Sequence, residues 1–327
     1  MKVAQTMRAA VSARYKSPDV IEVRDVPRPA PGAGEVLISV FATTVSRTDC
    51  GMLEPHPFFV RAAIGLFRPK LTILGMDFAG TIESVGSGVE AFDAGDRVFG
   101  MSPETFGAHA DYLCVPANGQ IALMPSGVAF NETVVCEGAW YADTNLRWLG
   151  VEAGQSILIY GASGAIGVAA VQLAKARGAT VTAVVGTRHL ELATALGADR
   201  VIDYTTEDFT QIGETFDAVF DTVGKTTYGR CRKLMKPAAR FSTTDLGPWW
   251  QNILLSTWHR LTGSRRVNIP FPTSRPDFVD DMRKLMESGA LRAVADRTYP
   301  LEAIADAYCY VSQGQKTGIV VIELGSN

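Results

Sequence analysis

The sequence predicts a two-domain α/β protein, in which a barrel-like β domain accompanies a parallel sheet with helices on both faces. Three observations support this fold class. A chain of 327 residues is longer than one typical hydrophobic core requires. Short apolar runs separated by Gly- and Pro-rich turns fill the chain up to about Pro125. Strands then alternate with helices, beginning with a strand–turn–helix–strand unit at residues 156–185.

The first part of the chain contains the expected β domain. Residues 35–42 carry Val36, Ile38 and Val40 at every second position, as a strand with one buried face does, and a turn-rich connector at 26–35 precedes them. The other expected strands are residues 9–13, 80–85, 96–99 and 108–115.

After about Asn131 the apolar segments become longer, and helices and strands alternate. This order predicts a parallel sheet whose faces are both covered. Besides the unit at 156–185, the expected helices are 132–149, 189–196, 228–234, 276–288 and 301–311. The expected strands are 200–202, 218–221, 240–243 and 318–324.

Three glycines in the unit at 156–185 point to a cofactor. Gly161, Gly164 and Gly167 follow the apolar run 156–160 and precede an alanine-rich segment that ends at Ala176. Small residues let the backbone approach a pyrophosphate, and a helix N-terminus offers free N–H groups and a positive dipole. We therefore expect dinucleotide binding. The alternative is a βα unit whose glycines only allow close helix–strand packing.

The residues after the second strand of this unit indicate which dinucleotide binds. An acid there would bind the ribose 2′-hydroxyl of NAD, but the loop reads Gly186-Thr187-Arg188-His189 and contains none. A hydroxyl beside a guanidinium suits a 2′-phosphate. The loop therefore favours NADPH over NADH, unless Arg188 is only a solvated residue at a helix start.

Composition excludes several classes of protein. The chain is 47% hydrophobic and 20% charged, with a net charge of −3, so nothing indicates a nucleic-acid partner. The N-terminal residues lack the apolar core of a signal peptide, and no apolar stretch is long enough to span a membrane. Five scattered cysteines suit free thiols in a reducing compartment, so we expect a cytoplasmic protein.

Seven segments, in order along nearly the whole chain, resemble the medium-chain dehydrogenase/reductase superfamily, and in particular its zinc-free quinone oxidoreductase (zeta-crystallin-like) branch. They are PAPGAGEVLISV (29–40), TILGMDFAGTIESVGSGV (72–89), GDRVFG (95–100), FGAHADYLCVPA (106–117), YGASGAIGVAAVQLAKARGA (160–179), LGADRVIDYTTEDF (196–209) and KTGIVVIEL (316–324).

The resemblance implies a GroES-like β-barrel domain, 1–126 with 273–327, and a Rossmann domain, 127–272. It implies that the turn residues Ser163, Gly164, Ala165 and Ile166 face the pyrophosphate of NADPH, together with Gly161 and Gly167. It further implies that Thr187, Arg188 and Tyr204 form the adenosine-phosphate site, and that Lys316 reaches the cofactor. A homodimer is expected by the same analogy.

A catalytic zinc is not expected. Zinc-dependent relatives carry a Cys-His-x-Asp segment and a Gly-His-Glu segment, which here read Ser46-Arg47-Thr48-Asp49 and Gly75-Met76-Asp77. Serine and methionine are poor zinc ligands. Cys136 lies near a third ligand position, but one cysteine makes no site. Without a metal, the expected reaction is hydride transfer to a quinone or an α,β-unsaturated carbonyl, since these acceptors delocalise the negative charge.

Four residues are candidates for the catalytic contacts. Ser46 or Arg47 is expected to hydrogen-bond the substrate oxygen. Asp49 either takes part or caps the turn that follows. Glu137 is either a proton donor or a buried hydrogen-bonding acid. We expect His109 and Tyr112 to be structural.

Two further functions and two apolar segments remain open. An alcohol dehydrogenase and an NADPH-binding redox sensor with little turnover are the alternative functions. Residues 56–70 are apolar and, with Trp249–Trp258, are expected to shape an apolar substrate entrance, which favours a bulky or lipophilic acceptor. Residues 247–266 contain three tryptophans and form a packed helix or loop, a lid over the substrate, or a contact with a partner or lipid.

Overall fold

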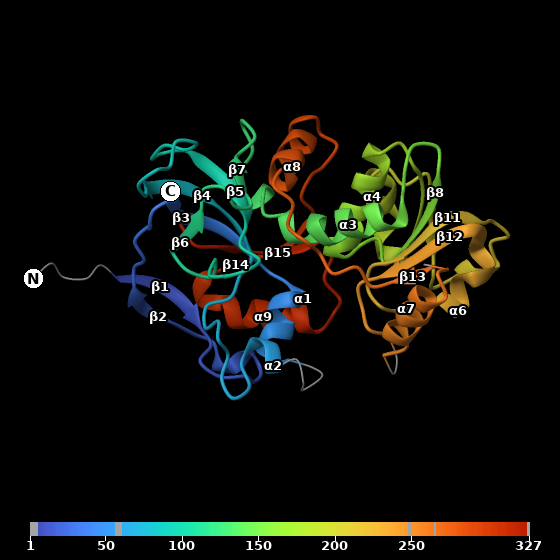
Figure 1. Ribbon diagram of the computed structural model, residues 1–327, viewed down its shortest axis with the longest axis horizontal. Helices are drawn as coiled ribbons and strands as arrows, with labels where there is room; N and C mark the ends of the chain where they lie inside the picture. Colours follow the sequence, from blue (N-terminus) through green and yellow to red (C-terminus); the bar gives the residue numbers. More distant parts are fainter. Residues whose placement is uncertain (1–5, 56–60, 248–249, 265, 326–327) are drawn as a thin grey trace, which may run out of the picture. The chain divides into compact units, whose positions relative to one another are not determined.

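The computed structural model describes residues 6–55, 61–247, 250–264 and 266–325 (Figure 1). The chain divides into two compact units. Unit 1 takes its described residues from 1–137, 275–287 and 292–327, so it contains both ends of the described chain. Unit 2 comprises 138–274 and 288–291. The first division therefore falls some ten residues after the expected boundary at 126.

Unit 1 is built around the long strand β3 (Glu35–Val45), most of whose side chains are buried. Strand β3 pairs antiparallel with β4 (Asp77–Val85), β6 (Tyr112–Pro116) and β15 (Ile319–Glu323), which brings the last strand beside an early one. The seven-stranded sheet has the order β14-β15-β3-β4-β5-β7, and β6 lies off this path. Its other strands are β5 (Arg97–Met101), β7 (Ile121–Leu123) and β14 (Ala295–Pro300), and β1 (Thr6–Val11) and β2 (Glu22–Pro27) form a separate pair. The helices of this unit are α1 (Arg47–Leu53), α2 (Arg61–Ile64), α8 (Phe278–Glu287) and α9 (Ile304–Ser312).

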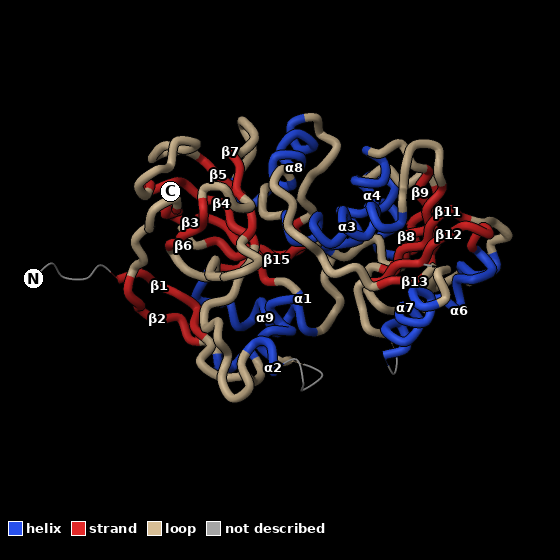
Figure 2. Tube along the Cα trace, viewed as in Figure 1, coloured by secondary structure: helices blue, strands red, loops and turns tan. Residues whose placement is uncertain are grey.

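Unit 2 is a six-stranded parallel sheet with helices around it (Figure 2). Its strand order is β10 (Arg200–Asp203), β9 (Thr180–Val185), β8 (Ser156–Tyr160), β11 (Phe216–Asp221), β12 (Met235–Thr243) and β13 (Val267–Asn268). The helices are α4 (Ala165–Ala176), α5 (Leu190–Ala195), α6 (Tyr228–Cys231), α7 (Gln251–Leu261) and most of α3 (Cys136–Leu149). The chain leaves β8 toward β9 and β10, then resumes on the other side of β8 with β11. A ligand-binding crevice forms at such a reversal, beyond the carboxyl ends of the strands.

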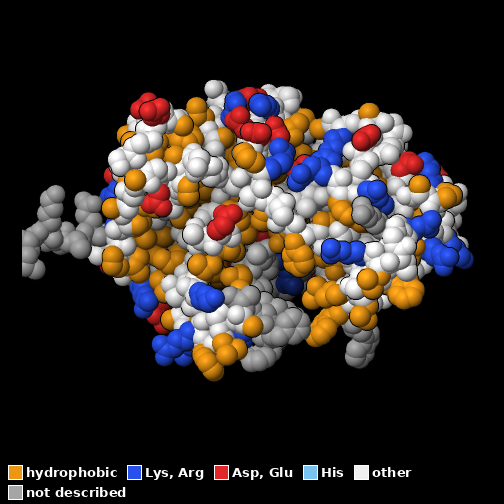
Figure 3. All heavy atoms as spheres, in the orientation of Figure 1, with side chains coloured by type: hydrophobic (Ala, Val, Ile, Leu, Met, Phe, Trp, Pro, Cys, Tyr) orange, Lys and Arg blue, Asp and Glu red, His pale blue; other side chains and the backbone are white. Residues whose placement is uncertain are grey.

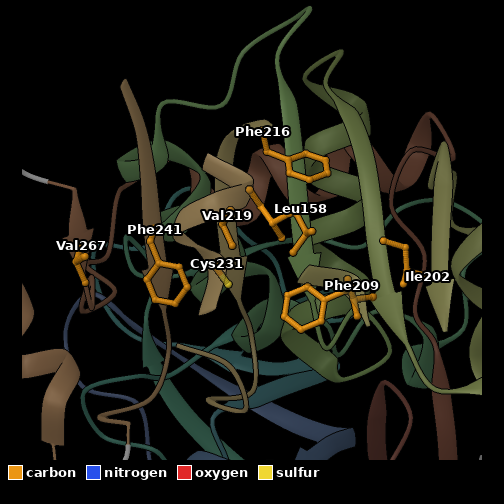
Figure 4. Close-up of a cluster of buried hydrophobic side chains, with 10 residues drawn as sticks. Leu158, Ile202, Phe209, Phe216, Val219, Cys231, Phe241 and Val267 are labelled. Carbon is orange, nitrogen blue, oxygen red and sulfur yellow. The ribbon is translucent and has the colours of Figure 1, made fainter. Parts of the chain in front are cut away.

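One core cluster of unit 2 draws a buried side chain from each of the six strands (Figure 4). These residues are Leu158, Val184, Ile202, Val219, Phe241 and Val267. Parallel strands with both faces covered need apolar residues of this kind throughout. The cluster holds the carboxyl ends of β8, β9 and β10 in register, and the candidate cofactor residues follow these ends.

The unit at 156–185 has the strand bounds that the sequence predicts, 156–160 and 180–185. Several other expected bounds need correction; the strand expected at 108–115 is Tyr112–Pro116, and that at 240–243 is Met235–Thr243. The first strand covers Thr6–Val11 rather than 9–13. Helix α3 begins at Cys136 rather than at 132, because the Glu132 carboxylate accepts the Ala129 N–H and closes a separate 3₁₀ turn. Within the part of the chain that the structure describes, no helix is long and apolar enough to cross a bilayer.

Candidate active site

The three glycines of the cofactor motif have different surroundings. Gly161 has φ of +79°, and a Cβ there would lie 2.6 Å from the side chain of Val223. A Cβ on Gly167 would overlap the carbonyl oxygen of Gly161. At Gly164, the N-cap of α4, the nearest atom would be 3.8 Å away. Gly161 and Gly167 therefore serve the packing of strand and helix, whereas Gly164 leaves open space before the helix.

The start of α4 fits a pyrophosphate. No side chain caps this 12-residue helix, so its first backbone N–H groups are available. The four residues expected to face the pyrophosphate, Ser163, Gly164, Ala165 and Ile166, are all partly exposed, while Gly167 is buried. The helix N-terminus and the open space at Gly164 are what a bound dinucleotide would require.

The neighbouring loop after β11 is tied to the glycine turn. The hydroxyl of Thr222 donates to the carbonyls of Tyr160 and Gly161, both at 2.9 Å. The carboxylate of Asp221 accepts the N–H groups of Val223 and Gly224, and burial raises its pKa to about 6. These bonds fix the two loops at the point where the strand order reverses.

The expected adenosine-phosphate residues lie together, but an acid accompanies them. Tyr204 is half exposed and lies over Gly186, where a Cβ would be 3.1 Å from the tyrosine hydroxyl. The hydroxyl of Thr187 donates to Asp203 at 2.6 Å. The loop contains no acid, but parallel pairing of β9 with β10 brings Asp203 beside it. The sequence of the loop alone does not reveal this acid, because Asp203 comes from the neighbouring strand.

Asp49 caps a helix. Ser46 is the N-cap of α1, and both its N–H and its hydroxyl donate to the Asp49 carboxylate at 2.8 Å. A second oxygen of Asp49 accepts the N–H of Gly75 at 3.0 Å. The side chain is fully buried, and this burial raises its pKa to about 6. Asp49 thus joins α1 to the loop before β4, as the structural alternative in the sequence analysis describes.

Glu137 belongs to a cluster of buried carboxyl side chains in unit 1, together with Asp77. Its backbone N–H donates to Asp77 at 2.8 Å, and burial raises the pKa of Asp77 well above its usual range. Burial, aided by the charge of Asp49, raises the pKa of Glu137 to about 7. Hydrogen bonds from Thr48 and Ser46 act in the opposite direction. The Glu137 carboxyl is therefore close to half protonated at neutral pH.

Lys316 adds a cation to the cluster of carboxyl side chains that contains Glu137. The lysine side chain is partly buried, and burial lowers its pKa to about 8. The charge of Glu137 favours the protonated lysine, and the Lys316 Nζ donates to the carbonyl of Gly318. The sequence alone gave no reason to place Lys316 near Glu137; strand β15 brings it there from the far end of the chain.

The remaining unit 1 candidates occupy different positions. Arg47 is exposed and donates to the carbonyl of Ser312 at 3.2 Å. His109 is buried, bonds the carbonyl of Thr44, and has its pKa lowered to about 4 by burial. Arg28 lies over the ring of Tyr112 at 3.7 Å. His109 and Tyr112 thus have structural contacts.

The residues present do not fit a zinc ion. The ligand positions hold Ser46 and Met76, and Cys136 is a buried thiol whose pKa is raised well above its usual range by burial. Among the described residues, no three His, Cys, Asp or Glu side chains are placed to hold a metal.

The apolar segment 56–70 is described only in part, because 56–60 lie outside the described residues. Phe67 is 88% exposed and Leu66 is 48% exposed.

Two protein families match parts of the chain. Residues 32–140 match the alcohol dehydrogenase GroES-like domain, and residues 196–322 match the zinc-binding dehydrogenase family. The 2-methylene-furan-3-one reductase of Solanum lycopersicum is 30% identical over 98% of this chain and 80% of its own length. The chloroplastic NADPH-dependent alkenal/one oxidoreductase of Arabidopsis thaliana is 29% identical over the same shares of the two chains.

A solved structure has the same fold. The quinone oxidoreductase from Coxiella burnetii superposes with a TM-score of 0.86 at 24% identity, over 98% of this chain and 100% of that one.

Proposed function

The chain belongs to the medium-chain dehydrogenase/reductase superfamily, in its quinone oxidoreductase branch, and is an NAD(P)H-dependent oxidoreductase. We propose that it transfers hydride from NADPH to a quinone or an α,β-unsaturated carbonyl. One observation carries the proposal. Beside Ser46 and Met76, which are poor zinc ligands, this chain has the buried carboxyl of Glu137 with partly buried hydroxyls and a lysine around it, and such a group can donate a proton.

Two features of unit 2 support a dinucleotide, and NADPH in particular. The open N-terminus of α4 suits the pyrophosphate, and Thr187, Arg188 and Tyr204 offer hydroxyl and guanidinium groups to a 2′-phosphate. The alkenal/one relative is named as NADPH-dependent. When bound, NADPH supplies a hydride, that is, two electrons and one hydrogen nucleus. The negative charge of Asp203 repels a phosphate at this position, so the effect of Asp203 on the choice between NADPH and NADH is tested directly below.

Glu137 is the residue that we assign to proton transfer. Hydride addition to the β-carbon of an enone leaves an enolate, which must take one proton at the α-carbon; a quinone that has accepted a hydride is a hydroquinone anion, which likewise must take one proton, on oxygen. The Glu137 carboxyl, protonated in part at neutral pH, gives up this proton and regains one from water. Thr48 orients the carboxyl, and Lys316 stabilises the carboxylate that remains.

The test of the proposal is NADPH oxidation, followed by absorbance, with NADH in parallel. The acceptors are 1,4-benzoquinone, 9,10-phenanthrenequinone, a 2-alkenal and a simple ketone. We expect turnover with a quinone or the alkenal and none with the ketone, with no effect of a chelator. Activity that depends on added zinc would favour an alcohol dehydrogenase. Tight NADPH binding without turnover would favour a redox sensor. A small lipophilic acceptor, a cytoplasmic location and a homodimer stay predictions.

A further inference from the structure

Helix α7 in unit 2 presents apolar side chains to the outside. Leu254, Trp258 and Leu261 are 69%, 64% and 80% exposed, and Ile253 is 39% exposed. Leu254, Trp258 and Leu261 are three or four residues apart, which places them on one helix face, and Ile253 lies at the border of that face. We call these four residues the α7 apolar stripe. Figure 3 shows apolar side chains gathered on the surface of unit 2 where Figure 1 places α7.

The opposite face of α7 holds the helix on its own unit, largely by polar contacts. Asn252 is buried and donates to the carbonyl of Asp245 at 3.1 Å. The hydroxyl of Ser256 bonds Asn268 of the edge strand β13 at 3.0 Å, and Leu255 packs on the core cluster. The usual arrangement of a surface helix is therefore reversed, because its more apolar side faces away from the core. Among the apolar residues of α7, only Leu255 packs on the core cluster, as the interpretation of this segment as a packed helix expects.

The sequence around α7 is basic and lacks acids. Between Asp245 and Asp277 there is no Asp or Glu, while the same segment contains four arginines. It also contains three of the chain's five tryptophans. The whole chain, by contrast, has a net charge of −3. Since acids are otherwise spread along the sequence, the segment combines the two properties of an interfacial helix, an apolar face and a cationic border.

Further cations adjoin α7 from helix α6. The rings of Tyr228 on α6 and His259 on α7 meet edge to face at 5.4 Å. The turn that continues α6 carries the exposed Arg232 and Lys233. On α7 itself Arg260 is exposed. The nearest acid in sequence, Asp245, lies before the helix and accepts the N–H of Gly247.

We propose that the α7 apolar stripe, with the basic residues around it, docks on an anionic phospholipid surface. Leucine and tryptophan side chains enter the boundary between headgroups and acyl chains, and arginines attract the phosphate groups. A second copy of the chain is a poorer occupant. A two-fold symmetric contact places the same patch on both sides, so it would set these cations against one another.

Sedimentation with vesicles tests this proposal on the full-length protein. We expect binding to vesicles of phosphatidylglycerol and phosphatidylcholine, much weaker binding to phosphatidylcholine alone, and loss of binding as salt rises from about 0.05 to about 0.5 M. The double variant Leu254→Ser/Leu261→Ser should lower the affinity for the anionic vesicles by about tenfold or more. The control Leu123→Ser, at an apolar residue that is 47% exposed in unit 1, should leave it unchanged.

Three outcomes would overturn the proposal. The first is equal vesicle binding by the double variant and the wild type, with both shown to be folded by circular dichroism. The second is a change of oligomeric state in the double variant, measured by light scattering, which would assign the stripe to a second copy. The third is a raised KM for a water-soluble quinone without vesicles, which would assign the stripe to a lid. Because vesicle binding needs no turnover, failure of the proposed activity leaves this test valid.

Discussion

The carboxyl of Glu137 is buried, yet it faces both a cation and hydroxyl donors. Burial disfavours the charged form, while Lys316 and the hydroxyls of Ser46 and Thr48 favour it. The result is a pKa of about 7, near the value that best suits a general acid at neutral pH. Asp49 has similar burial, but its oxygens are occupied by capping bonds, so it is less suited to proton transfer.

Replacing Glu137 with glutamine should lower kcat with an enone by about 100-fold, because the variant keeps the shape but loses the proton. In the wild type, kcat should fall as pH rises past about 7, since the carboxyl loses its proton there. The variant should lack this limb of the pH profile. The measurement is kcat against pH for both proteins, with Glu54→Gln, at an exposed residue of the same unit, as control. An unchanged profile in the Glu137 variant would assign this residue a structural role.

Arg188 and Asp203 should act in opposite directions on cofactor choice. Arg188→Ala should raise the KM for NADPH by about tenfold or more and leave that for NADH nearly unchanged, because a 2′-phosphate loses a charged partner. Asp203→Asn should lower the KM for NADPH, because a carboxylate 2.6 Å from the Thr187 hydroxyl repels the phosphate. If Asp203→Asn instead raises the KM for NADH alone, Asp203 binds a ribose hydroxyl and the enzyme uses NADH.

At the scale of elements, the glycines between strand β8 and helix α4 have two different roles, and substitution of each by alanine distinguishes these roles. Gly167→Ala should lower the Tm, since its Cβ would overlap the carbonyl of Gly161 and the backbone cannot yield cheaply. Gly164→Ala should leave the Tm nearly unchanged, since its Cβ meets nothing closer than 3.8 Å. It should raise the KM for NADPH by about tenfold, because the methyl group occupies the space for the pyrophosphate. Unchanged cofactor binding in Gly164→Ala would contradict the proposed position of the pyrophosphate.

The elements that the sequence predicts best are those with local patterns. The unit at 156–185 is determined by apolar runs and a glycine turn, and its strands have the predicted bounds. Helix α1 was not predicted, although Ser46 and Asp49 show the spacing of a capping box. Strands β2 and β14 carry too many exposed side chains for a clear alternation. Their formation depends on pairing with β1 and β15, and the periodicity of one strand does not show its partner.

The same limit applies to the candidate site. Residues in local motifs, such as Gly164 and Ser46, were found from sequence, and so was Glu137 at the start of α3. The contact of Asp203 with Thr187 and the charge of Lys316 beside Glu137 depend on which strands are neighbours. A sequence motif gives the residue type at a position, whereas sheet order determines its partner.

At the scale of the whole molecule, the buried groups that govern stability near neutral pH are mainly carboxyls, because burial raises the pKa values of the buried cysteines and of Tyr308 further above pH 7. Burial raises the pKa of Asp49 to about 6, of Glu137 to about 7 and of Asp221 to about 6. Each such group binds protons more tightly in the folded state, so folding is favoured when it is protonated. His109 has the opposite effect, since burial lowers its pKa to about 4 and the folded state gains stability as pH rises toward 6.5. Because the buried carboxyls outnumber His109, their effect on the pH dependence of stability prevails.

We therefore expect the stability of the folded protein to fall between about pH 5 and about pH 7.5. Over this range the unfolded carboxyls are already ionised, while the folded ones must still lose their protons, so the free energy of unfolding decreases. The aspartates with lowered pKa values change the free energy of unfolding only below about pH 4, and Lys316 changes it only above about pH 8.

The variant Glu137→Gln isolates the contribution of one carboxyl to this pH dependence. It should raise the free energy of unfolding by roughly 1–3 kcal/mol at about pH 8 and much less at about pH 5. The measurement is urea unfolding of both proteins at the two pH values. A stabilisation of equal size at both would mean that relief of side-chain packing, and not loss of a buried charge, accounts for the effect. A destabilisation at about pH 8 would show that the attraction between Glu137 and Lys316 exceeds the cost of burying the carboxylate.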